Sequence, residues 1–211
     1  MPSPASRLSK PSKIVCVGRN YAEHARELGN EVPKEPLIFL KPPSSIIGDG
    51  DSILLPPQSR QVEFEGEIAI LLGKGLHHAT ETEAAGAVRA VLAANDVTAR
   101  DLQRSDGQWT RAKGFDTFCP VGEPVAALPP LDDLTLVTRV NGEERQRACS
   151  TEMVFPIASV LAYISRIMSL EPGDLVLTGT PAGVGPLQDG DVVEIEIVGV
   201  SSVKNPVRSA P

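Results

Sequence analysis

The sequence has few aromatic residues, cysteines and histidines, and no long apolar run. Of its 211 residues 4% are aromatic, and it contains 3 cysteines and 3 histidines. Cys16, Cys119 and Cys149 are widely spaced without a C-x-x-C pair, which argues against a disulfide framework or a zinc knuckle and predicts reduced packing residues. Because no apolar run reaches about 18 residues, we expect no membrane-spanning helix.

Basic residues are outnumbered by acidic ones. The chain carries 20 Lys and Arg against 27 Asp and Glu, a formal net charge of -7, and no basic cluster longer than a pair. A nucleic-acid groove needs clustered positive charge, so we expect no nucleic-acid partner and a small molecule instead. The N-terminus is polar and Pro-rich, without the apolar core of a signal peptide, so we expect no membrane partner and a cytoplasmic protein.

The patterns that are present predict a single β-rich domain. A length of 211 residues with 41% hydrophobic residues suffices for one core. We expect a loose tail over residues 1–12, one domain over 13–205 and a frayed C-terminus over 202–211. Regular β-α-β alternation is missing, so the pattern predicts an α+β fold with a mixed or antiparallel β-core and a few short helices.

Local patterns predict several individual elements. Period-2 alternation indicates strands, apolar residues at helical spacing indicate helices, and Asn-Gly indicates a hairpin. The main expectations are a strand over 13–18, a short helix after a capping Asn20, a long strand over 62–72, a hairpin at Asn141 and Gly142, a helix over 157–167 and a strand over 192–199.

Two carboxylates interrupt the apolar stretch FEGEIAILL. In a strand, residues two apart share a face, so Glu63, Glu65 and Glu67 point together, and Ala69 and Leu71 continue that face as apolar residues. One interpretation is a solvated edge strand whose charges oppose aggregation. The apolar continuation favours an inward face, where a carboxylate costs several kcal/mol unless it is paired or metal-bound.

Asp96 interrupts a second apolar pattern, in LAANDVTARDLQ, although an Asp there can also begin a turn. Together Glu65, Glu67 and Asp96 offer three oxygen ligands without His or Cys. Hard cations such as Mg²⁺ or Mn²⁺ suit that donor set, whereas zinc does not.

Three further stretches can carry chemistry, and each has a plainer interpretation. His24 and Glu27 lie three apart on a helix, where the carboxylate can hold a general base or belong to a solvated charge pattern. Lys113 lies among aromatic residues, where it can stabilise an oxyanion or extend along the surface. The Gly- and Pro-rich loop 177–191 can lay backbone N–H groups against a carboxylate, but matches no nucleotide-binding fingerprint. The sequence has no G-x-S-x-G, which argues against a nucleophile-elbow hydrolase.

Six stretches in a fixed order cover most of the chain, from about residue 13 to residue 200. They are CVGRNYAEHARELG, PLIFLKP, VEFEGEIAILLG, ANDVTARDLQ, GQWTRAKGFDTFCPVG and GDLVLTGTPAGVGPLQDGD. This ordered set resembles the fumarylacetoacetate hydrolase family, in its short single-domain branch of acylpyruvate hydrolases and oxaloacetate decarboxylases. The resemblance implies a β-rich mixed roll, a catalytic domain over 13–205 and a homodimer.

The resemblance also implies roles for individual residues. Glu65, Glu67 and Asp96 correspond to the Mg²⁺ ligands, with Mn²⁺ as an alternative metal. His24 and Glu27 correspond to a catalytic base pair on a lid helix, and Lys113 corresponds to a catalytic cavity lysine. Residues implied to bind substrate are Arg19, Tyr21, Lys41, Arg100, Gln103 and Thr180.

The implied activity is metal-dependent hydrolysis of a C–C bond in acylpyruvate-type 2,4-dioxo acids, such as acetylpyruvate or fumarylpyruvate, with release of pyruvate. Decarboxylation of oxaloacetate, or isomerisation or decarboxylation of aromatic-degradation diacids, can use the same metal site. Because decarboxylation needs no base, the presence of His24 and Glu27 favours hydrolysis. From a different class, a non-catalytic Mg²⁺-dependent dicarboxylate binder needs the acids but not the base.

Overall fold

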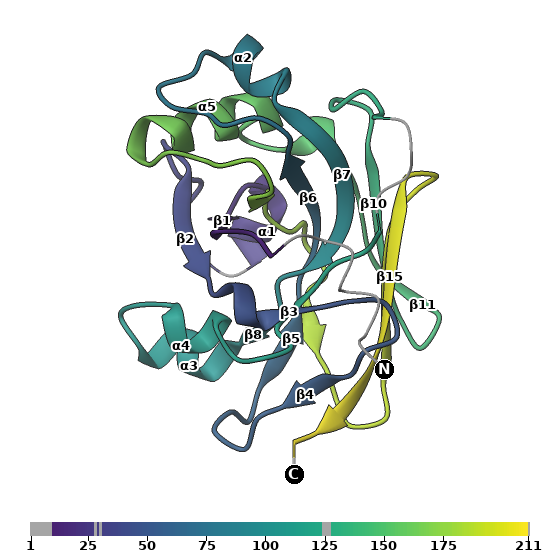
Figure 1. Ribbon diagram of the computed structural model, residues 1–211. Helices are drawn as coiled ribbons and strands as arrows, with labels where there is room; N and C mark the ends of the chain where they lie inside the picture. Colours follow the sequence, from purple (N-terminus) through teal and green to yellow (C-terminus); the bar gives the residue numbers. More distant parts are fainter. Residues whose placement is uncertain (1–9, 28, 30, 124–127, 211) are drawn as a thin grey trace.

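The computed structural model describes residues 10–27, 29, 31–123 and 128–210 (Figure 1). Most of the regular secondary structure of these residues consists of short strands in mixed sheets, and the helices are few and short. The α+β, β-rich architecture predicted from the sequence is therefore confirmed. The expectation of a loose tail falls largely on residues 1–9, which lie outside the described residues.

One mixed sheet carries the strands that later supply the candidate site. Within the described residues its order is β2-β1-β12-β6-β7. β1 runs parallel to β12, and the other neighbouring strands run antiparallel. The strand bounds are β1 Ile14–Gly18, β2 Leu37–Lys41, β6 Gly66–Leu72, β7 Val88–Asn95 and β12 Leu175–Leu177.

A second sheet packs against β6 and β7, beside them in Figure 1. Its order in the described part of the chain is β11-β10-β14-β15-β4. Ile68 and Ile70 of β6 join the core with this sheet, whereas Ala69 and Leu71 belong to a separate apolar cluster on the other face. The bounds are β4 Ile53–Leu55, β10 Thr135–Val140, β11 Glu143–Cys149, β14 Val192–Ile197 and β15 Ser201–Ser209.

Smaller elements complete the fold. Short strands pair as β13-β5-β8 and β3-β9. Their bounds are β3 Ile46–Ile47, β5 Val62–Phe64, β8 Thr98–Ala99, β9 Cys119–Pro120 and β13 Gly185–Pro186. The helices are α1 Ala22–Glu27, α2 Glu81–Ala85, α3 Arg100–Ser105, α4 Thr110–Lys113 and α5 Ile157–Ile167, with 3-10 turns at Pro43–Ser45 and Ser150–Glu152.

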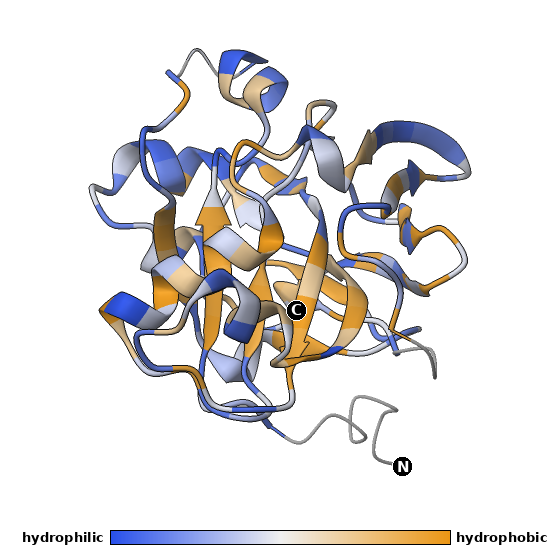
Figure 2. Ribbon diagram, turned by 90° about the horizontal axis from the view of Figure 1, so that it is seen from above, coloured by the Kyte–Doolittle hydropathy of each residue, from blue (hydrophilic) through white to orange (hydrophobic). Residues whose placement is uncertain are grey.

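Several local predictions are confirmed. Asn141 and Gly142 take positive φ values of 54° and 83° and join β10 to β11, as a two-residue hairpin requires. β14 alternates buried and half-buried residues. The predicted helix over 157–167 is α5, which packs on α2 at one end of the sheets (Figure 1). Figure 2 shows hydrophobic residues concentrated in the central strands and hydrophilic residues in the peripheral helices and loops.

The prediction of one long strand over 62–72 is wrong. The chain breaks at Glu65 into two strands, β5 and β6, which pair in different sheets. At the break, the Glu65 N–H donates to Asn95 Oδ1 (2.9 Å) and the Gly66 N–H donates to Gln146 Oε1 (3.0 Å). A Cβ on Gly66 would lie 2.0 Å from Thr138 Oγ1, so the chain approaches the second sheet too closely for another residue. Side-chain acceptors thus replace strand partners where the acids lie.

The expected frayed C-terminus is also wrong. Residues 201–209 form β15, which pairs with β14 on one side and with β4 on the other. Val203, Asn205 and Val207 are buried, so one face of this strand belongs to the core. At the other end, Ser12 does not behave as part of a loose tail, since its N–H and hydroxyl both donate to Asp174 Oδ1 (2.9 and 2.7 Å).

Asn20 does not cap α1, contrary to our expectation. Its Nδ2 donates to the carbonyls of Thr178 and Phe155 (2.8 and 3.1 Å), and its Oδ1 accepts from the Phe155 N–H (2.8 Å). Asn20 therefore ties the end of β1 to two distant segments instead of starting the helix. None of the described helices is long and apolar enough to cross a membrane.

Candidate active site

Three buried carboxylates converge where β6 and β7 pair. Glu65 lies at the break before β6, Glu67 lies within β6, and Asp96 follows the last residue of β7. The antiparallel register pairs Gly66 with Asn95, which brings the two acidic segments side by side. One oxygen from each carboxylate lies within 4.8 Å of the others. The structure thus brings together the three acids that the sequence nominated as metal ligands.

Basic side chains surround this carboxylate cluster. Lys113 Nζ lies 2.8 Å from Glu65 Oε2 and 2.6 Å from Asp96 Oδ2. Arg100 pairs with Glu65 Oε1 (2.6 Å) and with Glu63 Oε2 (2.7 Å). Burial would raise the pKa of Glu65, but the charges of Lys113 and Arg100 outweigh it and hold that pKa well below its usual range. Lys113 and Arg100 therefore favour the ionised form of Glu65.

Glu67 has less compensation than Glu65. It is 1% exposed, and its Oε2 accepts a hydrogen bond from the Gly179 N–H (2.6 Å). Burial, reinforced by the negative charges of Asp96 and Glu65, raises the pKa of Glu67 well above its usual range. A proton or a bound cation would relieve this repulsion. The site therefore carries one negative charge more than its own basic residues neutralise.

Asp96 retains an oxygen without a hydrogen bond. Its Oδ1 lies 2.7 Å from Lys41 Nζ, within ion-pair distance. This buried oxygen has no hydrogen-bond partner among the described residues, so the ion pair with Lys41 is what balances it. An all-oxygen set of three buried carboxylates, with no sulfur or nitrogen ligand, fits a hard divalent cation. Glu65, Glu67 and Asp96 can therefore hold a metal ion.

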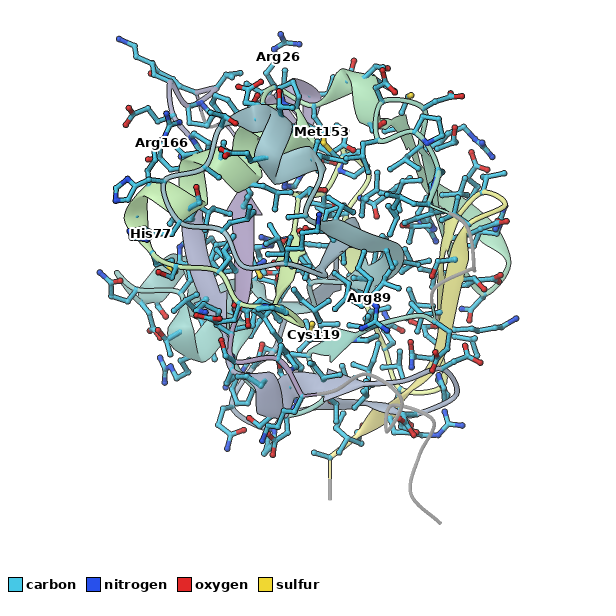
Figure 3. All side chains as sticks on the ribbon, turned by 45° about the horizontal axis from the view of Figure 1, so that its top comes forward. Arg26, His77, Arg89, Cys119, Met153 and Arg166 are labelled. Carbon is cyan, nitrogen blue, oxygen red and sulfur yellow. The ribbon has the colours of Figure 1, made fainter. Side chains whose placement is uncertain are left out.

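His24 and Glu27 meet on α1. His24 Nδ1 lies 3.0 Å from Glu27 Oε2, and Glu27 in turn accepts from the Gly183 N–H (3.1 Å to Oε1). His24 is buried, whereas Arg26, between them in the sequence, points outward from the molecule in Figure 3. α1 thus presents His24 inward, and the loop after β12 fixes the carboxylate that orients its ring.

A small cavity joins these groups, and it contains His24 as well as all three acids of the carboxylate cluster. Arg19, Arg100, Gln103, Lys113 and Thr180 also line it. Lys41 and Tyr21 are not among its lining residues. Lys41 lies behind Asp96 and donates to the Lys113 carbonyl (2.6 Å), while Tyr21 lines a separate pocket beside α1. Most of the predicted site residues therefore share one cavity. Lys41, Tyr21 and also Glu27, which contacts His24, lie outside its lining.

Sequence reasoning missed two kinds of residue at this site. Phe39 and Trp109 line the cavity and stack edge to face with ring centroids 5.1 Å apart. Aromatic residues near Lys113 were noted, but no pattern placed Phe39 beside them. Gln146 was missed entirely: it is buried, binds the Gly66 N–H, and donates to Thr180 Oγ1 and the Pro181 carbonyl (both 2.8 Å). A Gln between two Arg residues in a strand gives no signal of such a role.

Comparisons with known proteins agree with this geometry. The family model described as fumarylacetoacetate (FAA) hydrolase C-terminal matches residues 13–208. Oxaloacetate tautomerase Fahd2a, mitochondrial, from Rattus norvegicus is 42% identical over 211 residues, covering 95% of this chain and 67% of that protein.

Two solved structures are similar over nearly the whole chain. A 5-carboxymethyl-2-hydroxymuconate delta-isomerase from Mycobacterium smegmatis has a TM-score of 0.89 and 44% identity, covering 96% of this chain and 80% of the other. Fumarylpyruvate hydrolase from Pseudomonas aeruginosa, in complex with Mn²⁺ and pyruvate, has a TM-score of 0.89 and 32% identity, covering 95% and 91%. Because the family match spans the carboxylate cluster, the His24 helix and the loop that holds Glu27, the chain belongs to the fumarylacetoacetate hydrolase family of enzymes.

Proposed function

We propose that this protein is a Mg²⁺-dependent enzyme that hydrolyses a C–C bond in acylpyruvate-type 2,4-dioxo acids and releases pyruvate. The observation that carries the proposal is that His24, oriented by Glu27, lines the same cavity as the carboxylate cluster. The similar Pseudomonas aeruginosa structure is named as a fumarylpyruvate hydrolase with Mn²⁺ and pyruvate, which supports both a divalent metal and this product.

The cluster of Glu65, Glu67 and Asp96 would hold the metal. When bound there, a hard cation supplies Lewis acidity and a template for the 2-oxo and carboxylate oxygens of the substrate. Lys113 and Arg100 keep Glu65 ionised, and their positive charge also favours the enolate that forms during cleavage. The three carboxylates would thus bind the metal, and the basic residues around them would favour an anionic substrate in the same cavity.

His24 would act as the general base. With Nδ1–H donating to Glu27, Nε2 is free to take a proton from water. The water oxygen bonds to the distal carbonyl carbon, and the C–C bond then breaks with its electron pair left on the methylene carbon of pyruvate. Return of the proton to that carbon gives pyruvate and a carboxylic acid. Glu27 positions His24 throughout, since its own contact with the Gly183 N–H fixes its place.

A second candidate is proton transfer or loss of CO₂ on oxaloacetate. The named tautomerase is 42% identical to this chain, and the Mycobacterium smegmatis structure is named as an isomerase. Tautomerisation needs a base that moves a proton between C3 and the 2-oxo oxygen, which His24 can also supply. Decarboxylation needs no base, so its rate would be indifferent to His24.

The test is pyruvate release from acetylpyruvate and from oxaloacetate, with Mg²⁺ and with EDTA. We expect metal-dependent cleavage of acetylpyruvate that falls about 10²–10⁴-fold in His24→Ala. His77→Ala is the matched control, because His77 is exposed and lines a different pocket from the cluster. Turnover of oxaloacetate alone, unchanged by His24→Ala, would replace the hydrolase with a decarboxylase. A His24-dependent enol–keto exchange without pyruvate release would favour the tautomerase.

A further inference from the structure

Glu63 is a buried carboxylate that the proposed reaction does not use. It is 6% exposed, and it is not among the residues that line the cavity. Its Oε2 accepts a hydrogen bond from Arg100 Nε (2.7 Å), and its Oε1 accepts one from Gln61 Nε2 (2.6 Å). Both oxygens of this carboxylate are therefore bound by other side chains, and one of these, Arg100, also reaches the carboxylate cluster.

Strand pairing brings Glu63 beside Arg100. Glu63 of β5 lies opposite Thr98 of β8, and Arg100 begins α3 two residues later. The Arg100 N–H donates to the Gln61 carbonyl (2.7 Å), so the pairing continues through the backbone into the start of the helix. The register of these two short strands therefore holds the Glu63 and Arg100 side chains next to each other inside the protein.

Arg100 divides its guanidinium between three acceptors. Nε donates to Glu63 Oε2 (2.7 Å), Nη2 donates to Glu65 Oε1 (2.6 Å), and Nη1 donates to Gln103 Oε1 (2.6 Å). One positive charge is thus shared between two buried carboxylates, of which only Glu65 belongs to the carboxylate cluster. Charges interact strongly in a buried environment, so the presence of Glu63 offsets part of the charge that Arg100 would otherwise exert on Glu65.

We propose that Glu63 is a positioning residue for the metal site and that it acts on Glu65 through Arg100. This inference rests on the proposed function, in which Glu65 is a metal ligand. With the Glu63 carboxylate in place, Arg100 orients Glu65 while part of its own charge is neutralised. Without that carboxylate the full charge of Arg100 acts on Glu65 and opposes a divalent cation bound there. Glu63 therefore raises the metal affinity of the cluster without being a ligand.

The hydrogen-bond chain around Glu63 requires a carboxylate at this position. Arg104 Nη2 donates to Gln61 Oε1, so the Gln61 amide presents its Nε2 to Glu63. On the other side, the Arg100 guanidinium has donors only. A carboxylate accepts from both neighbours, whereas an amide at position 63 would place its own NH2 group against a donor on one side. A glutamine of nearly the same shape is therefore a sharp test of this position.

The experiment measures Mn²⁺ affinity by calorimetric titration of the full chain. In Glu63→Gln we expect Mn²⁺ to bind about 10-fold more weakly, as is usual when a residue that orients a metal ligand is lost. Glu63→Asp keeps the charge on a shorter side chain that cannot reach both neighbours, so its affinity should lie between those of Glu63→Gln and the wild type. Glu196→Gln is the matched control, because it makes the same substitution opposite another arginine, Arg139 (2.7 Å), in the second sheet. Its Mn²⁺ affinity should stay within about twofold of the wild type.

Thermal unfolding in EDTA separates positioning from folding. Glu63→Gln should lower the melting temperature because one buried hydrogen bond is lost, but a purely structural role would leave the Mn²⁺ affinity of the folded protein unchanged. Wild-type affinity in Glu63→Gln, or an equal loss in Glu196→Gln, would overturn the inference. If Glu63→Gln does not fold, Glu63→Asp decides, and wild-type affinity in that variant would overturn the inference as well.

The titration needs no turnover, so the proposed reaction and this inference can fail separately. If the wild type cleaves neither acetylpyruvate nor oxaloacetate but Glu63→Gln still binds Mn²⁺ more weakly, the hydrolase is abandoned and the role of Glu63 is retained. If the wild type cleaves acetylpyruvate and both proteins bind Mn²⁺ equally, the hydrolase is retained and the role of Glu63 is overturned. A wild-type protein that binds no Mn²⁺ would overturn both.

Discussion

Two groups of buried acids in this protein differ in how completely they are satisfied. Asp174, next to β12, is fully buried, and its Oδ1 accepts from the N–H groups of Ser12 and Lys13 and from the Ser12 hydroxyl. Its Oδ2 accepts from Lys13 Nζ (2.6 Å) and the Glu171 N–H (2.9 Å). By contrast, Asp96 Oδ1 forms an ion pair with Lys41 (2.7 Å) but no hydrogen bond with any described residue.

The difference distinguishes a carboxylate that the fold satisfies fully from carboxylates that it satisfies only in part. Each oxygen of Asp174 has at least two donors, so its ionised form is stabilised by the fold alone. Glu67 has one backbone donor and two like charges nearby, and burial together with those charges raises its pKa, so its ionised form has fewer stabilising contacts than that of Asp174. A buried carboxylate with too few hydrogen bonds or ion pairs lowers the stability of the fold. A site can keep such a carboxylate where a bound ligand supplies the missing contacts.

Replacing Glu67 by Gln should have the largest effect on function. The substitution removes a charged ligand from the cluster, so we expect activity to fall about 10³-fold or more and Mn²⁺ affinity to fall with it. The metal-free protein should be no less stable, because the neutral amide relieves the repulsion with Asp96 and Glu65. Steady-state rates, Mn²⁺ titration and urea unfolding in EDTA measure the three quantities. Unchanged Mn²⁺ affinity would remove Glu67 from the metal site.

Replacing Asp174 by Ala should show the opposite pattern. The N–H groups of Ser12 and Glu171 and the Lys13 ammonium lose their acceptor, so we expect the free energy of unfolding to fall by about 2–4 kcal/mol. The kinetic parameters well below the melting temperature should match those of the wild type. A loss of kcat comparable to that in Glu67→Gln would show that the two regions do not differ as the structure suggests.

A substitution of Gln146 tests whether a residue that positions the proposed metal ligands affects metal affinity as the ligands themselves do. It holds the Gly66 N–H, between Glu65 and Glu67, and also Thr180. In Gln146→Met we expect a loss of about tenfold in Mn²⁺ affinity.

The matched control is Asn205→Leu, because Asn205 is an equally buried amide whose Nδ2 donates to the Gly48 and Asp51 carbonyls (2.8 and 2.9 Å). The Asn205→Leu variant should be less stable than the wild type but should keep its Mn²⁺ affinity. Equal losses of metal affinity in the two variants would reduce Gln146 to a general folding role.

The smallest predicted effect is the dependence of stability on acid at Asp174. Burial would raise the pKa of Asp174, but Lys13, the Glu171 N–H and Ser12 together lower it below the usual value of 3.8. Because the unfolded chain takes up the proton at a higher pH than the folded one, the stabilisation is complete above about pH 4 and is lost as the pH falls through the folded pKa. Urea unfolding from about pH 5 to about pH 2.5 should show this loss in the wild type and not in Asp174→Asn. Identical slopes for both proteins would contradict it.

Predictions from the sequence succeeded where neighbours along the chain decide the outcome. The alternation in β6 correctly placed Ala69 and Leu71 on a separate face from Ile68 and Ile70. Helical spacing correctly brought His24 within reach of Glu27. The ordered stretches identified the family, which carried the expectation for Asp96 that spacing alone left open.

Predictions failed where the partner lies far along the chain. The break at Glu65 depends on a hydrogen bond with Asn95. The position of Asn20 depends on hydrogen bonds with Phe155 and Thr178. β15 was taken for a frayed end because it lies at the C-terminus, yet it pairs with β14 on one side and with β4 on the other. In each case local propensity was outweighed by hydrogen bonds that only the folded chain can form.

The sequence by itself determined the family, the faces of the strands and the set of acids, because side-chain periodicity and residue type are local properties. Only the tertiary structure decided which charges are matched. It paired Lys113 and Arg100 with the carboxylate cluster and left Glu67 beside two like charges. The physical reason is that a buried charge has its energy set by every group within a few ångströms, and those groups come from strands and loops that meet only when the sheets pack together.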